Sequence, residues 1–144
     1  MYEKILYPTD GSECSKKALK HVVEIAKKFN SKVFVLHAFP FVPEYIGSPY
    51  REKIISQSTL EAEKITKEAA KVLEENNIDY EIEILEGPAH KAILTVADVR
   101  KVDLIIMGSR GISALAGALL GSVSQKVATH AKCPVMIVRE KESE

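Results

Sequence analysis

The 144-residue sequence lacks a charge imbalance, because its 20 basic and 20 acidic residues cancel, and it contains no block of five like charges. A nucleic-acid face or an anionic membrane surface usually requires a basic excess or cluster, so neither partner is expected. The sequence also lacks a run of eighteen apolar residues, and Met1 is followed by YEKILYPTD rather than by a basic segment and an apolar signal stretch. We therefore expect a soluble, cytoplasmic protein in which any anion site is local.

Cysteine and histidine are both scarce. Cys14 and Cys133 lie far apart in the sequence and form neither a C-x-x-C pair nor a metal-ligand cluster. This pattern fits a reducing compartment and predicts no structural disulfide. The four histidines show no H-E-x-x-H or other ligand spacing, so we expect packed or solvated side chains rather than metal ligands at His21, His37, His90 and His130.

Short apolar segments alternate with amphipathic segments along the chain. The apolar segments predict strands over 4–8, 32–39, 80–85, 102–107 and 134–138. Apolar residues at helical spacing predict helices over about 12–29, within 51–76, from 87–88 to 101, and from 122 to 132. Such alternation implies parallel strands joined by right-handed crossovers. We predict one domain over residues 1–144, a Rossmann-like α/β fold whose open five-stranded parallel sheet has the order 3-2-1-4-5 and carries helices on both faces.

Two local features refine this prediction. The first predicted helix has one apolar face, which should pack on the sheet and consists of Ala18, Val22, Ile25, Ala26 and Phe29.

The connector over 40–50, PFVPEYIGSPY, contains three prolines and a glycine, so we expect no regular structure there. Long connectors in compact domains are often functional, and this one could either cap a site or merely cross the end of the sheet.

Glycines and hydroxyls gather where a parallel sheet binds ligands. That place is the carboxyl edge between the strands whose crossovers diverge, here strands 4–8 and 102–107. PTDGS follows the first strand, and MGSRG leads from the second toward Gly121-Ser122 at a helix start. The unpaired N–H groups and the dipole of a helix start attract phosphate, and glycine allows close approach. Ser122 could cap this helix or donate to a phosphate, and Ser124 lies in the same turn. Each feature alone is also ordinary turn chemistry.

The glycines form neither the dinucleotide motif G-x-G-x-x-G nor a P-loop with its lysine. They read Gly108-x2-Gly111-x9-Gly121-Ser122. This spacing resembles the signature G-x2-G-x9-G-[ST] of the ATP-binding branch of the universal stress protein family. The segments KILYPTDGSECSKKAL, GPAHKAIL and CPVMIV are also similar to that family, so the resemblance covers nearly the whole chain.

The resemblance implies a site for ATP or another adenine nucleotide. Adenine would lie against Ala38 and Met107 with polar contacts from the Thr9-Asp10 turn, ribose would lie by Gly108, and phosphates would meet Gly111 and residues 121–124. The full implied set is Pro8, Thr9, Asp10, Ala38, Met107, Gly108, Arg110, Gly111, Gly121, Ser122, Val123 and Ser124. We further hypothesise that the glycines at 108, 111 and 121 are present because the nucleotide occupies the space of their Cβ atoms.

Charge decides how two of these residues are assigned. Arg110 could neutralise phosphate, with a solvated loop arginine as the alternative. A carboxylate beside a triphosphate repels it, so Asp10 is assigned to the adenine or ribose end, with a water-mediated metal contact as the lesser option. Mg²⁺ should be held mainly by the phosphates, so we expect no protein metal ligands.

The resemblance and the edge position of strand 134–138, which carries no charge to block pairing, together predict a homodimer through that strand.

The segment 108–124 offers hydroxyls and one arginine but no carboxylate, histidine or lysine for phosphoryl transfer. The sequence therefore favours a stress-response or regulatory module that acts as a nucleotide-dependent switch or sensor. A slow ATP hydrolase and a structural dimer that binds no nucleotide remain as alternatives. The protein partner is not identified by the sequence.

Overall fold

The computed structural model describes residues 1–110 and 120–140. Its elements are β1 Lys4–Pro8, α1 Glu13–Phe29, β2 Lys32–Phe39, the 3-10 helix η1 Glu44–Ile46, α2 Tyr50–Glu75, β3 Tyr80–Glu86, α3 Ala89–Arg100, β4 Leu104–Gly108, α4 Ser122–His130 and β5 Val135–Val138. Every predicted strand and helix is present, with ends that differ by two residues or fewer.

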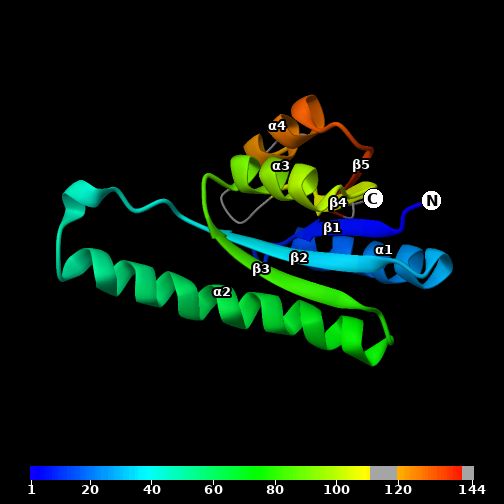
Figure 1. The fold of residues 1–144 in the computed structure, drawn as a ribbon, viewed down its shortest axis with the longest axis horizontal. Helices are drawn as coiled ribbons and strands as arrows, with labels where there is room; N and C mark the ends of the chain where they lie inside the picture. Colours follow the sequence, from blue (N-terminus) through cyan, green and yellow to red (C-terminus); the bar gives the residue numbers. More distant parts are fainter. Residues whose placement is uncertain (111–119, 141–144) are drawn as a thin grey trace.

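The five strands form one sheet in the order β3-β2-β1-β4-β5, and every neighbouring pair is parallel (Figure 1). This confirms the predicted α/β fold and places β1 at the centre. Strand β1 pairs with β2 from Lys4↔Lys32 to Pro8↔Leu36. The carboxyl ends of β1 and β4 are adjacent, so the switch point lies where the order predicts.

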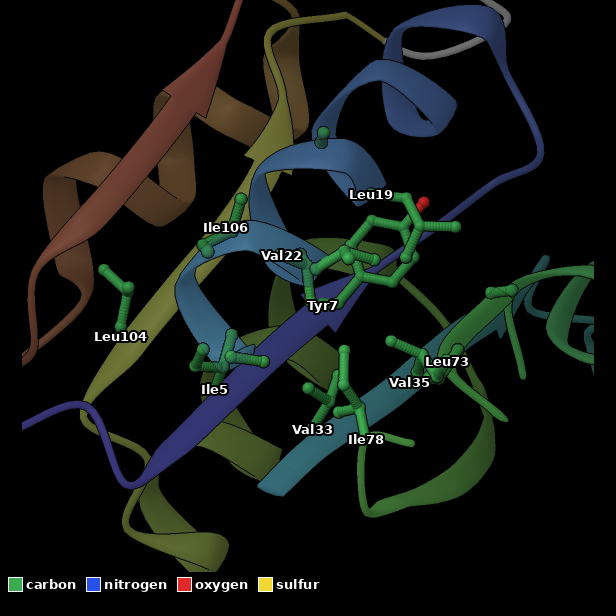
Figure 2. Packing of buried hydrophobic residues seen from close by; sticks show 14 of the residues in the cluster. Ile5, Tyr7, Leu19, Val22, Val33, Val35, Leu73, Ile78, Leu104 and Ile106 are labelled. Carbon is green, nitrogen blue, oxygen red and sulfur yellow. The ribbon is translucent and has the colours of Figure 1, made fainter. Parts of the chain in front are cut away.

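Each face of the sheet carries its own apolar core. Side chains that alternate along the strands separate the two, so that one set packs under α1 and α2 and the other under α3 and α4. Figure 2 shows the first core, which includes Ile5, Tyr7, Leu19, Val22, Val33, Val35, Leu73, Ile78, Leu104 and Ile106. The second core includes Leu6, Phe34, Leu36, Ile93, Val96, Ile105, Met107 and Val127.

Two expectations about local structure are wrong. Phe29 does not join the buried face of α1, because it lies at the helix end, where its side chain is 41% exposed and packs edge to face on Tyr2. Leu19 and Val23 are buried on α1 in addition to the expected residues. The connector over 40–50 also contains regular structure, since η1 lies within it.

The connector and the first turns of α2 project beyond the sheet (Figure 1). Several apolar side chains on this projection are exposed, namely those of Phe41, Tyr45, Tyr50 and Leu60. Arg51 holds the connector to α2 through a hydrogen bond from Nη2 to the Val42 carbonyl at 3.3 Å. Both cysteines are free thiols. Within residues 1–110 and 120–140, no helix is long and apolar enough to cross a membrane.

Candidate functional site

Three of the sequence-predicted residues share one face at the carboxyl edge of the sheet. Ala38 and Met107 pack with the core under α3 and α4, at the ends of β2 and β4. Pro8 ends β1 between them, two residues after Leu6 of the same core, so alternation places it on this face as well. The structure therefore places Ala38 and Met107, the two residues expected to contact a base, on one face with Pro8 between them.

Strands β1 and β2 separate just beyond this apolar set. Their pairing ends at Pro8↔Leu36, followed by a hydrogen bond from the Thr9 N–H to the Leu36 carbonyl at 2.8 Å. In β2, the Lys32 N–H points to β1 and the Val33 N–H points to β3. Because this direction alternates along a parallel strand, the Ala38 N–H faces the side from which β1 has turned away. The Ala38 N–H is thus directed to the side of β2 on which the pairing with β1 has ended.

The turn after β1 is fixed by its own side chains. The Thr9 hydroxyl donates to Ser15 Oγ at 3.1 Å and accepts from the Gly11 N–H at 3.2 Å. Asp10 Oδ1 accepts from the Ser12 N–H at 2.9 Å, and Gly11 has φ +80°, which suits glycine. The Thr9 side chain therefore supports the turn from within the protein, since it is 8% exposed.

A buried tyrosine anchors this turn from the opposite face of the sheet. The Tyr7 hydroxyl donates to the Ser15 carbonyl at 2.6 Å, and the side chain lies against Leu19 in the core (Figure 2). Burial raises the pKa of Tyr7 to about 12, so the phenol stays protonated and remains a donor at neutral pH.

Gly108 is explained by packing rather than by a ligand. A Cβ added there would lie 2.9 Å from the Cys14 carbonyl carbon and 3.0 Å from the Ser15 nitrogen. These are backbone atoms of the first turn of α1, so a side chain at 108 would push the helix off β4. The hypothesis that nucleotide occupies the Cβ space is therefore wrong for Gly108. Gly111 lies outside the described residues.

The start of α4 lies against the end of β4. Gly121 is the N-cap, with φ −73° and ψ 166°, so the option that Ser122 caps this helix is wrong. The Gly121 N–H donates to the Ser109 carbonyl at 2.6 Å. Ser124 Oγ donates to the same carbonyl at 2.8 Å and lies 3.1 Å from the Gly121 carbonyl. Ser109 thus ties the helix start to the sheet.

The two serines of this helix start differ in what they can offer a ligand. Ser122 is exposed, whereas Ser124 is 2% exposed and its hydroxyl contacts backbone carbonyls. The first bond within the helix runs from the Gln125 N–H to the Gly121 carbonyl at 3.0 Å. The N–H groups of residues 122–124 precede it and have no acceptor inside the helix, which is the arrangement that binds anions. Arg110 follows Ser109 after the end of β4, and it is half-buried.

Ser15, Ser109 and His37 also take part in the contacts at this edge, and the sequence pattern did not predict them. The carbonyl of Ser109 and the hydroxyl of Ser15 act through contacts between elements, and no local pattern signals such contacts. His37 was expected to be packed or solvated, and it is buried, with Nδ1 2.8 Å from the Thr9 carbonyl. The sequence feature that could have identified His37 is its position immediately before Ala38, a predicted base contact.

Comparison with known proteins gives a consistent result. A model of the universal stress protein family matches residues 1–139. Universal stress protein MJ0531 of Methanocaldococcus jannaschii is 36% identical over 147 residues, which cover 100% of this chain and 86% of the relative. The solved structure of MJ0577 superposes with a TM-score of 0.91 at 35% identity and 99% coverage of both chains. A universal stress protein solved in complex with cAMP superposes with a TM-score of 0.75 at 29% identity, covering 95% of this chain and 97% of that one.

Proposed function

The chain belongs to the universal stress protein family, and from that premise we propose that it is a module that binds ATP at the carboxyl edge of its sheet. The observation that carries the proposal is that two complementary features meet at this edge. The end of β2 at Ala38 offers an apolar surface with a backbone N–H, and the start of α4 offers N–H groups that have no acceptor inside the helix. Strands β2 and β4 flank β1 and are two strand spacings apart, roughly 10 Å, so Ala38 and Met107 border the same short stretch of the sheet edge.

The proposed placement of the nucleotide follows the chemistry of each part. Adenine lies against Pro8, Ala38 and Met107, and ribose lies near the Thr9-Asp10 turn and Gly108. The phosphates lie at the start of α4, where the N–H groups of residues 122–124 and the exposed Ser122 hydroxyl donate to them. Arg110 and Gly111 complete the phosphate end, and Mg²⁺ is carried by the phosphates. A relative that binds cAMP supports an adenine nucleotide as the ligand class.

The proposed role is binding rather than turnover. Hydrolysis of ATP needs a group that orients water beside the γ-phosphate, and the segment 108–124 contains no carboxylate, histidine or lysine. A switch or sensor requires only that the bound and free forms differ in what they present to a partner. Phosphate release on the order of 1 per second or faster, abolished by Ser122→Ala, would instead favour the hydrolase.

A pair of valine substitutions on α4 tests where the phosphates bind. Gly121→Val places a branched side chain over the helix start, while the backbone angles at 121 suit any residue. Ala128→Val adds a similar group to an exposed position of the same helix. We expect Gly121→Val to lose ATP binding and Ala128→Val to keep it, with both proteins folded. Equal ATP affinity in the two variants would contradict the proposed site.

We also propose that the module forms a homodimer through β5. This strand lies at the edge of the sheet, and Val135, Met136 and Ile137 are only half-buried. A short apolar edge strand with unpaired backbone groups is suited to pair with a second copy about a two-fold axis. Light scattering at micromolar concentration should therefore give twice the chain mass of 15.9 kDa.

A further inference from the structure

His37 lies at the point of the candidate site where the pairing of β1 and β2 ends. It lies on β2 directly before Ala38, one residue beyond the last β1–β2 pair, Pro8↔Leu36. The side chain is 9% exposed. Its Nδ1 lies 2.8 Å from the Thr9 carbonyl oxygen, so the imidazole donates from Nδ1 to that oxygen.

This contact replaces a backbone hydrogen bond. The alternation of the β1–β2 ladder would next join the Ala38 N–H to the Thr9 carbonyl. The imidazole of His37 supplies a donor to that carbonyl instead. The Thr9 carbonyl therefore has a donor other than the Ala38 N–H, and that N–H still points to the side of β2 on which the pairing with β1 has ended.

Thr9 is held at all of its polar atoms by this arrangement. Its N–H donates to the Leu36 carbonyl at 2.8 Å, its hydroxyl donates to Ser15 Oγ, and its carbonyl accepts from His37. Only the last of these contacts involves a side chain of β2, the strand that carries Ala38. His37 is thus the side chain that couples the β1 turn to the strand end where a base would lie.

Resting on the proposed function, we propose that His37 is a positioning residue that makes the site selective for adenine. By holding the Thr9 carbonyl, it keeps the Ala38 N–H available for an acceptor on the base edge. Adenine N1 is such an acceptor, whereas guanine carries a proton at N1 and presents a donor to the same group. Without the imidazole, the Ala38 N–H turns to the Thr9 carbonyl, and the preference for adenine falls.

The test compares His37→Leu, His37→Asn and the control His21→Leu, whose histidine is exposed on α1. Affinities are measured for ATP, GTP and tripolyphosphate, each with Mg²⁺. We expect the parent to prefer ATP over GTP, and His37→Leu to lose roughly three- to tenfold of that preference, the effect of one neutral hydrogen bond. Tripolyphosphate affinity should not change. His37→Asn should restore the preference, because its amide nitrogen can take the place of Nδ1.

The outcomes separate this inference from the proposed function. A parent that binds neither nucleotide overturns the proposed function and the base-selective role with it. Equal losses for ATP, GTP and tripolyphosphate, or an unchanged ATP preference in His37→Leu, overturn the role of His37 alone. Nitrogen NMR of the imidazole in the parent without ligand gives a further test that needs no variant. The structure predicts the proton on Nδ1, and a neutral ring protonated only at Nε2 would contradict the inference.

Discussion

Gly108→Ala tests whether packing, rather than a ligand, demands glycine at the end of β4. The added methyl would lie 2.9 Å from the Cys14 carbonyl carbon and 3.0 Å from both the Ser15 nitrogen and Cys14 Sγ. Unstrained carbon contacts are about 3.5–4.0 Å, so α1 must move from β4 by about half an ångström. Two of the three atoms belong to the helix backbone and cannot rotate away. We expect overpacking to cost about 1–3 kcal/mol of the free energy of unfolding.

The assay is thermal and urea unfolding of the chain without nucleotide. A cost of this size should lower the Tm by roughly 3–10 °C in a chain of this length. Cys14→Ala in the same background removes the Sγ contact but leaves both backbone contacts, and it also removes the hydrogen bonds of Sγ with the Val138 carbonyl and Ser109 Oγ, so it should not restore the parental Tm. If Gly108→Ala unfolds like the parent and loses only nucleotide affinity, the packing argument is refuted and the ligand explanation returns.

Three further predictions follow from buried groups and from the sheet edge. Burial holds the pKa of Tyr7 at about 12, whereas an exposed tyrosine titrates near 10. The contribution of Tyr7 to the free energy of unfolding should therefore be complete below pH 10 and fall by about 2–3 kcal/mol between pH 10 and 12. In Tyr7→Phe, the free energy of unfolding measured between pH 10 and 12 should decrease less than in the parent. Ser124→Ala should lower the Tm in the absence of ligand, because it removes a buried hydrogen bond worth about 1 kcal/mol. Ser122 is exposed, so Ser122→Ala should lower the affinity for ATP and leave the Tm unchanged. Met136→Lys should convert the proposed dimer to a monomer in light scattering, and a dimer that persists in the folded variant would exclude pairing through β5.

The element order and the parallel pairing could be predicted because they depend on local signals, whereas the strand order 3-2-1-4-5 was a supposition that the structure confirms. Apolar runs marked the strands, helical spacing marked the helices, and the alternation of the two required parallel pairing. The position of the switch point followed from that topology. Phe29 escaped the prediction because helical spacing reports a face, whereas burial also depends on how far the partner sheet extends along the helix.

Contacts between elements explain what the sequence could not predict at the site. The spacing of the glycines indicated a family, but it did not reveal that Gly108 faces the backbone of α1. Two serines in one helix turn look equivalent in the sequence, yet only Ser124 reaches the Ser109 carbonyl. The role of His37 likewise depends on where β1 turns away from β2, which is a property of the strand register.

The most direct test of the account is calorimetric titration of the unmodified chain with ATP in the presence of Mg²⁺. We expect saturable heat at one site per chain, with a Tm that rises as ATP is added. Ligand at about a hundred times its Kd should stabilise the fold by roughly 2.7 kcal/mol. No heat and no stabilisation at millimolar ATP would contradict the claim that the carboxyl edge of this sheet is a nucleotide site.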